Sequence, residues 1–156
     1  MKNGQKLVIA FAMYVCIGIT FGFNIANAQQ TTSRRYINLP DKTVQAPFSD
    51  GVLIGNTLYL SGRLGLDPKT GKAPDSLGIE ITLLLDGVKA ALAAGDMTMN
   101  DLAYVQVFCP DLSLYNAFNA MYRTYFSNDF PARAFIGCAS LLRGCHFEMQ
   151  CIAVKQ

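Results

Sequence analysis

Apolar residues recur along this chain with two spacings, and these spacings predict the order of strands and helices. Short apolar runs bounded by Gly, Pro, Asn or Asp are typical of strands. Such runs occur at residues 36–39, 52–54, 57–61, 102–108, after Pro131 to about Ala139, and 145–154. Because only the turn Gly55-Asn56 separates the second run from the third, these two runs predict a hairpin.

Two longer segments have helical spacing instead. The first begins after an N-cap at Asp75 or Ser76 and ends at a C-cap at Gly95. Its apolar residues form one stripe, made of Ile81, Leu84, Leu85, Val88 and Leu92. The second, residues 112–126, follows Asp111, which can cap it. Amphipathic helices need a sheet to cover, so the pattern predicts one α+β domain, a mixed sheet with both helices on one face.

Side chains alternate between the two faces of a strand, and this alternation predicts which face of the sheet each charged residue of the last two strands occupies. Arg133 and Phe135 share one side of the penultimate strand, whereas Cys138 lies on the other. On the last strand Cys145 belongs to the apolar side and Glu148 to the opposite one. Because the apolar sides should face the helices, we expect Arg133, Phe135 and Glu148 on the sheet face away from them. We expect Cys138 and Cys145 on the helix-facing side of one hairpin, where they either form a disulfide or remain buried free thiols.

Arg133 is the candidate functional residue that this pattern singles out. It enters an apolar strand directly after Pro131-Ala132, whereas nearly all other cations lie in polar, turn-like or terminal sequence. An unpaired buried charge is unfavourable, so Arg133 needs a partner or an anionic ligand. Glu148 is the only acid in the last apolar run and is the obvious partner. The sequence leaves open whether the two residues form a structural ion pair or a functional site.

Residues 1–28 have the three-part pattern of a secretory signal peptide. A basic start precedes the almost wholly apolar residues 7–23, and residues 26–28 are the small-x-small cleavage site Ala-Asn-Ala. The alternative is an uncleaved membrane anchor, for which the apolar run is slightly short. We therefore expect cleavage after Ala28, a domain at residues 29–156, and a periplasmic or secreted protein.

The composition limits the kind of partner and the kind of chemistry. The 156 residues carry a formal net charge of only +2, which gives no reason to expect nucleic acid or an anionic membrane as a partner. After residue 28 the chain has one histidine, His146, and no Cys-x-x-Cys pair. Redox catalysis and zinc binding are therefore not expected, and a metal-free mechanism is the default. His146 is expected to be solvated or to lie at an interface.

The sheet face away from the helices predicts self-association. It is expected to carry Phe135, Ile152 and part of the first hairpin beside its charges, which is too apolar for a whole sheet face in water. No sequence remains in the domain to cover it. We therefore expect a homo-oligomer in which these faces meet.

This sequence resembles the RidA family (YjgF/YER057c/UK114) of enamine/imine deaminases over essentially all of residues 29–156. The resemblance depends on residues 46–51, 60–62, 67–71, 115–119 with Tyr122 and Phe126, 130–133 and 147–154. The stretch Phe-Pro-Ala-Arg and the ending Glu-x-x-x-Ile-Ala-Val are strong when they occur together. The resemblance implies a chorismate-mutase-like α+β fold and a homotrimer with active sites in clefts between subunits. It also implies that no metal or organic cofactor is needed.

The resemblance implies roles for individual residues as well. In such proteins the arginine that matches Arg133 holds the carboxylate of a 2-imino or 2-enamino acid, a task that suits a bidentate guanidinium. The glutamate that matches Glu148 positions or deprotonates the attacking water, and the products are a 2-oxo acid and ammonia. Ser61, Gly62 and Asn119 match further residues of the substrate pocket.

Two positions depart from the family pattern. Phe48 stands where deaminase members often have tyrosine, and Phe135 stands where a small residue or cysteine is common. Both are expected at the substrate pocket, with Phe48 lacking a hydroxyl and Phe135 narrowing or reshaping the space. Ser61 serves either as a substrate contact or as a strand-end hydrogen-bond donor. Three functions stay open: an exported imine deaminase, a trimeric binder of small carboxylates without turnover, and an interaction protein of the same shape.

Overall fold

The computed structural model describes residues 33–40 and 46–155, and the predicted signal peptide lies outside these ranges. Its strands are β1 (Arg34–Ile37), β2 (Gly51–Ile54), β3 (Thr57–Leu64), β4 (Leu102–Cys109), β5 (Ala132–Gly137) and β6 (Glu148–Val154). Its helices are α2 (Leu77–Ala94) and α3 (Tyr115–Tyr122). Short 3-10 turns are η1 (Met99–Asp101), η2 (Leu112–Leu114), η3 (Arg123–Tyr125) and η4 (Leu142–Gly144).

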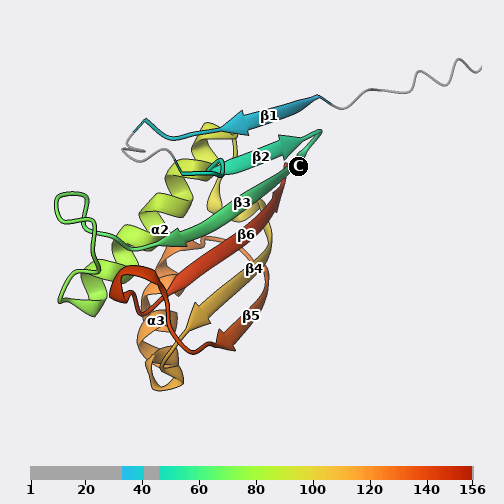
Figure 1. Ribbon diagram of the computed structural model, residues 1–156. Coiled ribbons are helices and arrows are strands. Elements are labelled where there is room, and N and C mark those ends of the chain that lie inside the picture. The colour runs from blue at the N-terminus through green and yellow to red at the C-terminus, as the bar shows by residue number, and fades with distance from the viewer. Residues whose placement is uncertain (1–32, 41–45, 156) are drawn as a thin grey trace, which may run out of the picture. The chain divides into compact units, whose positions relative to one another are not determined.

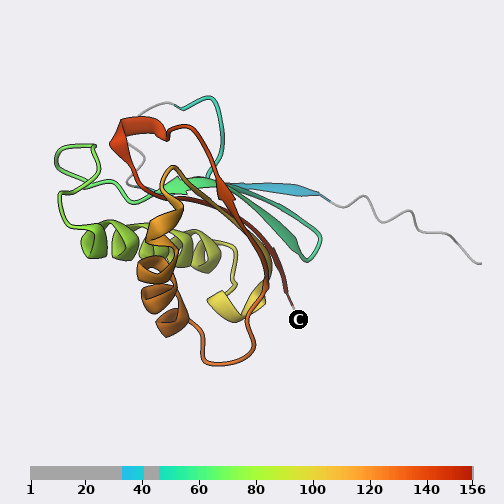
Figure 2. The ribbon, with the colours of Figure 1, turned by 90° about the horizontal axis from the view of Figure 1, so that it is seen from below.

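The six strands form one mixed sheet in the order β1-β2-β3-β6-β4-β5 (Figure 1). Every neighbouring pair is antiparallel except β4 and β5, which are parallel. Both helices lie against the same face of this sheet (Figure 2). The predicted α+β fold, a mixed sheet with two helices on one face, is confirmed. Neither helix of the described residues is long and apolar enough to cross a membrane.

The apolar stripe predicted for the first helix is the buried side of α2. Each of its residues is buried: Ile81, Leu84, Leu85, Val88 and Leu92. Ser76 is the N-cap and Gly95 the C-cap, as the sequence predicts. From the sheet, Leu58, Val105 and Phe147 are 0% exposed and pack into the same cluster. The core therefore lies between the sheet and the two helices.

The hairpin predicted for the last two strands is wrong. β5 is the outer strand of the sheet and pairs only with β4, whereas β6 lies between β3 and β4. A parallel pair needs a crossover connection, and α3 supplies it between β4 and β5. The chain then passes from β5 to β6 through η4 (Figure 1).

Without that hairpin, Cys138 and Cys145 do not face each other across paired strands. Cys138 follows β5, and its N–H donates to the carbonyl oxygen of Cys109 over 3.2 Å. Cys138 and Cys145 are free thiols, as are Cys109 and Cys151. Burial raises the pKa of Cys145 to about 11. It raises the pKa of Cys151 to about 12, so both thiols stay protonated at neutral pH.

The sheet face away from the helices is left open by the described residues (Figure 2). A row of paired apolar residues crosses it, and in strand order the row consists of Tyr36, Val52, Tyr59, Ile152 and Tyr104. Its three tyrosines are between 37% and 60% exposed. We call this set the open-face row. An apolar row of this width is suited to contact with another protein surface.

Candidate functional site

Arg133 lies beside a cavity at the outer edge of the sheet. The cavity has a volume of about 300 Å³ and is lined by Tyr115, Asn119, Tyr122, Arg123, Phe130, Pro131 and Arg133. Tyr115, Asn119 and Tyr122 come from one side of α3, because residues spaced by four and three positions share a helix face. One helix face and the start of β5 therefore build this site around a guanidinium.

The Arg133 side chain is held by neutral and aromatic groups. Its Nη2 donates a hydrogen bond of 2.6 Å to Oδ1 of Asn119. Its guanidinium carbon lies 4.6 Å from the ring centroid of Tyr122, a cation–π contact, and 5.9 Å from that of Tyr115. Among the described residues no carboxylate lies within ion-pair distance of Arg133. The structural ion pair with Glu148 is therefore not formed within one subunit, and the charge of Arg133 is available to an anion.

Arg133 and Phe135 face the helices, so their predicted placement on the opposite sheet face is wrong. The parallel register sets Arg133 beside Val105 and Phe135 beside Val107, and both valines are 0% exposed. The ring of Phe135 packs edge-on against Tyr115, with centroids 5.0 Å apart. The prediction failed because it assumed an antiparallel hairpin, whereas α3 supplies polar and aromatic partners on the helix side.

Glu148 lies on the sheet face away from the helices, as predicted, and its carboxylate covers Gly62. β3 has a bulge at Ser61-Gly62, between its pairing at Leu60 and its pairing at Arg63. The predicted strand end at Ser61-Gly62 is therefore a bulge, and the strand continues beyond it. A Cβ added at Gly62 would collide with the Glu148 carboxylate. Only glycine fits here without moving that carboxylate.

Ser61 ties the segment before β2 to this bulge. Its Oγ donates to the carbonyl oxygen of Ser49 over 2.6 Å, and its N–H donates to the carbonyl oxygen of Asp50 over 3.0 Å. The hydroxyl thus acts as a structural donor, one of the two roles expected for it. Phe48, the neighbour of Ser49, is 55% exposed. The segment that carries Phe48 is therefore anchored at the bulge.

The predicted site residues form two groups in one subunit. The arginine group, on the helix side of β5, consists of Asn119, Arg133 and Phe135. The glutamate group, at the bulge of β3, consists of Phe48, Ser61, Gly62 and Glu148. One subunit does not bring the two groups together. Across residues 33–40 and 46–155, no set of three or more His, Cys, Asp or Glu side chains is placed to hold a metal ion.

Two tyrosines of the cavity are absent from the predicted site residues. Hydrogen bonding to Asn119, and then the charge of Arg133, lower the pKa of Tyr115. Burial raises the pKa of Tyr122. The Tyr122 hydroxyl is buried and has no hydrogen-bond partner among the described residues. Their spacing with Asn119 along α3 was the signal in the sequence that could have found them.

Glu80 is a further residue that the sequence analysis missed. It is 0% exposed, and its Oε1 accepts hydrogen bonds from the N–H groups of His146 and Phe147 over 2.6 and 3.1 Å. Its Oε2 lies 2.7 Å from Nδ1 of His146. His146 is therefore held by a buried acid rather than simply solvated. These contacts fix the chain immediately before Glu148.

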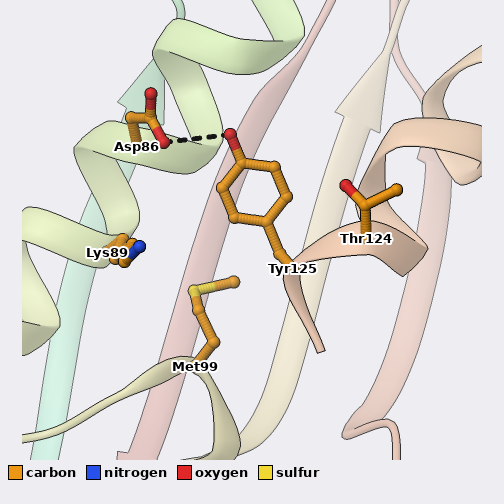
Figure 3. A pocket seen from close by; sticks show the side chains of 5 residues that line it. All are labelled: Asp86, Lys89, Met99, Thr124 and Tyr125. Carbon is orange, nitrogen blue, oxygen red and sulfur yellow. Dashed lines mark hydrogen bonds between the residues drawn. The ribbon is translucent and has the colours of Figure 1, made fainter. Parts of the chain in front are cut away.

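A second cavity, of about 390 Å³, lies on the helix side of the molecule (Figure 3). It is lined by Asp86, Lys89, Met99, Thr124 and Tyr125. The Tyr125 hydroxyl donates to Oδ1 of Asp86 over 2.9 Å and so joins η3 to α2. None of the predicted site residues lines this cavity.

Comparison with known proteins identifies the family. The family model described as endoribonuclease L-PSP matches residues 40–155. A 2-iminobutanoate/2-iminopropanoate deaminase of Escherichia coli strain K12 is 33% identical over 113 residues, covering 70% of this chain and 88% of that protein. A RutC family protein of Sulfurisphaera tokodaii is 31% identical over 110 residues, with the same coverage of 70% and 88%. The chain belongs to the RidA (YjgF) family, whose model carries the endoribonuclease L-PSP description.

Solved structures agree with this assignment. The crystal structure of the YjgF gene product of Escherichia coli has a TM-score of 0.72 and 30% identity, and the match covers 78% of this chain and 99% of that chain. RidA from an Antarctic Psychrobacter has a TM-score of 0.71 and 29% identity, with 78% and 100% covered. Escherichia coli TdcF with bound serine has a TM-score of 0.71 and 26% identity, also with 78% and 100% covered. The described domain therefore has the fold of RidA proteins.

Proposed function

We propose that this protein is an exported imine deaminase that hydrolyses small 2-imino or 2-enamino acids to 2-oxo acids and ammonia. The observation that carries the proposal is Arg133, which lines a cavity of about 300 Å³ and has no carboxylate partner among the described residues. A guanidinium can bind a carboxylate through two parallel hydrogen bonds, which fix its orientation as well as its affinity. Relatives named 2-iminobutanoate/2-iminopropanoate deaminases, in Escherichia coli and Capra hircus, support the choice of substrate class.

A second copy of the chain would join the two groups of site residues. We infer a homotrimer, the assembly expected for this family, in which the arginine group of one subunit meets the glutamate group of the next. The open-face row supports this inference, because exposed apolar rows on a sheet are stabilised when another subunit covers them. The edge position of β5 also leaves Arg133 within reach of a neighbour.

Glu148 would act on water at the carbon atom of the imine. As the water oxygen forms its bond to that carbon, the carboxylate accepts a proton. The carboxylate passes this proton to the imine nitrogen, so that the C=N double bond becomes a single bond and a carbinolamine forms. The carboxylate then moves the remaining hydroxyl proton to the nitrogen, the C–N bond breaks, the carbonyl forms and ammonia leaves. One water is consumed for each imine, and no oxidant or reductant takes part. The imine carbon is already electrophilic, so positioning and modest general-base help are sufficient.

The two departures from the family pattern shape the substrate site. The ring centroid of Phe135 lies 5.0 Å from that of Tyr115 and 5.7 Å from that of Phe118, so Phe135 packs against Tyr115, which lines the cavity. Phe48 is exposed and offers apolar contact without a hydroxyl. The site would therefore favour an acid with an apolar side chain.

The second candidate is a binder of small carboxylates without turnover. It is favoured by Ser61, whose hydroxyl proton is used by the carbonyl oxygen of Ser49, and by the missing hydroxyl at Phe48. A structure of the relative TdcF holds serine, which carries a carboxylate. Both functions use Arg133 to hold the carboxylate, and only the deaminase needs Glu148.

The loss of 2-iminopropanoate, generated in situ, separates these functions. We expect wild type to accelerate its hydrolysis, and Arg133→Ala and Glu148→Ala to reduce kcat/KM by about 100-fold or more, because each removes a charged group that contacts the reacting molecule. Arg35→Ala, which removes an exposed arginine paired with Asp96, is the matched control and should keep its activity. Wild type that binds pyruvate without accelerating hydrolysis supports the binder. Wild type that does neither contradicts both and leaves the interaction protein.

Export is the part of the proposal that concerns residues 1–28. We propose cleavage after Ala28, on the basis of the basic start, the apolar run and the Ala-Asn-Ala site. N-terminal sequencing of the protein from the periplasm or the medium should begin at Gln29. A membrane-bound protein with an intact N-terminus would support the uncleaved anchor instead.

A further inference from the structure

Arg133 can only donate hydrogen bonds, and this determines how the neighbouring polar side chains are oriented. A guanidinium only donates, and Nη2 of Arg133 donates to Oδ1 of Asn119 over 2.6 Å. The oxygen of the Asn119 side chain is thereby turned toward Arg133, and its amide nitrogen is left as a donor. Tyr115 lines the cavity beside both residues, and the guanidinium carbon of Arg133 lies 5.9 Å from the centroid of its ring. Both neighbours therefore present N–H groups, which can donate to a phenol oxygen but cannot accept its proton.

The pKa values of two tyrosines agree with this direction. A hydrogen bond that a phenol oxygen accepts favours the phenolate, and the bond from Asn119 and the charge of Arg133 lower the pKa of Tyr115. A bond that a phenol donates to a carboxylate has the opposite effect. Burial, together with the bond donated to Asp86, raises the pKa of Tyr125 to about 12. The lowered pKa of Tyr115 therefore agrees with donor groups, and not an acceptor, beside its oxygen.

The Tyr115 proton is available to a ligand. Tyr115 is 43% exposed and lines the same cavity as Arg133. Among the described residues neither neighbour takes its proton, because Arg133 has no acceptor and the Asn119 oxygen accepts its hydrogen bond from Arg133. The Tyr122 hydroxyl, by contrast, is buried. Tyr115 is thus the tyrosine of this cavity whose hydroxyl can reach a molecule bound there.

We propose that the Tyr115 hydroxyl donates a hydrogen bond to the carboxylate of the ligand, as a second recognition group beside Arg133. This inference rests on the proposed function, because it takes the ligand to be a 2-imino or 2-oxo acid. A carboxylate has about four acceptor positions, so it can accept two bonds from a guanidinium and one from a phenol. Asn119 holds Arg133 at the wall of the cavity that Tyr115 also lines. The pair selects free acids over their esters and amides, which lack the negative charge.

Tyr115→Phe tests this inference, because it removes the hydroxyl and keeps the ring that packs on Phe135. Two quantities are measured: the Kd of pyruvate by calorimetry, and kcat/KM for 2-iminopropanoate generated in situ. We expect the Kd to rise and kcat/KM to fall by about tenfold or more, the effect of one hydrogen bond to a charged group. Tyr125→Phe removes a phenol hydroxyl bonded to Asp86 at the second cavity (Figure 3) and should change neither quantity.

The outcomes separate this inference from the proposed function. If wild type binds pyruvate and hydrolyses the imine while Tyr115→Phe matches it in both, the role of Tyr115 is contradicted and the deaminase stands. If wild type binds pyruvate without turnover, the deaminase is contradicted, and the Kd of Tyr115→Phe still decides the role of Tyr115. Wild type that neither binds nor hydrolyses contradicts both. The thermal unfolding temperature of Tyr115→Phe is compared with that of wild type. Equal temperatures exclude a folding defect as the cause of weaker binding.

Discussion

The Arg133 guanidinium and the Glu148 carboxylate lie on opposite faces of one sheet. Arg133 is in register with Val105 on the side that the helices cover, and Glu148 is in register with Phe108 on the side that they leave open. A site that uses both groups must take them from different copies of the chain. The outer position of β5 makes such sharing geometrically simple.

Gly62→Ala should disable Glu148 without replacing it. The new Cβ would collide with the carboxylate, so the side chain must move to another rotamer. A displacement of about 1 Å in a catalytic group can reduce the rate about 100-fold, and we expect a fall in kcat of about that size. Steady-state hydrolysis of 2-iminopropanoate measures it, with circular dichroism to verify folding.

Gly78→Ala is the control for the glycine change. Gly78 lies in the first turn of α2, where an added Cβ meets no atom closer than 3.9 Å. We expect unchanged kcat and a gain of about 0.5–1 kcal/mol in the free energy of unfolding, because alanine restricts the unfolded chain. A Gly62→Ala variant that keeps wild-type kcat would show that the position of Glu148 does not matter for turnover.

Glu80 should contribute to stability mainly through the hydrogen bonds that it accepts from backbone N–H groups. Glu80→Ala leaves the N–H groups of His146 and Phe147 without their acceptor in a buried site, and we expect the free energy of unfolding to fall by about 2–5 kcal/mol. Glu80→Gln keeps an acceptor oxygen and should lose clearly less. Urea unfolding measures both. Equal losses in the two variants would mean that the contact with the His146 ring, and not the backbone bonds, carries the effect.

Carboxylate binding should weaken in alkaline solution at a pH below the ordinary tyrosine range. Hydrogen bonding to Asn119 and the charges of Arg133 and Arg123 lower the pKa of Tyr115. Below that pKa the neutral phenol donates to the ligand, and above it the phenolate repels the ligand anion and offsets the charge of Arg133. The Kd of pyruvate should therefore rise as pH increases through the lowered pKa. A calorimetric series in pH measures this rise, and an identical rise in Tyr115→Phe would assign it to another group.

Local patterns predicted most of the fold because each depends on neighbouring residues. The stripe from Ile81 to Leu92 needs only the helical period, and the hairpin at Gly55-Asn56 needs only a short turn. The partner of β5 could not be predicted in this way. Whether it pairs with β4 or β6 depends on α3 acting as a crossover, which is a property of the whole chain.

The candidate site was likewise predictable only where it depends on local sequence. Arg133 stood out because a cation entered an apolar strand, but its partners Asn119 and Tyr122 come from a separate helix. The role of Glu80 was missed because its partner His146 lies 66 residues away. Residues joined by tertiary contacts become visible only when the elements that carry them are placed in space.

Mixing two inactive variants is the most direct test of a site shared between copies. Arg133→Ala and Glu148→Ala each lose one half of every site, so each alone should be nearly inactive. When they are refolded together in equal amounts, random assembly gives about one quarter of the sites an intact Arg133 from one copy and an intact Glu148 from the next. We predict about a quarter of wild-type hydrolysis of 2-iminopropanoate. A mixture as inactive as its components, with subunit exchange verified by mass spectrometry, would contradict the shared site.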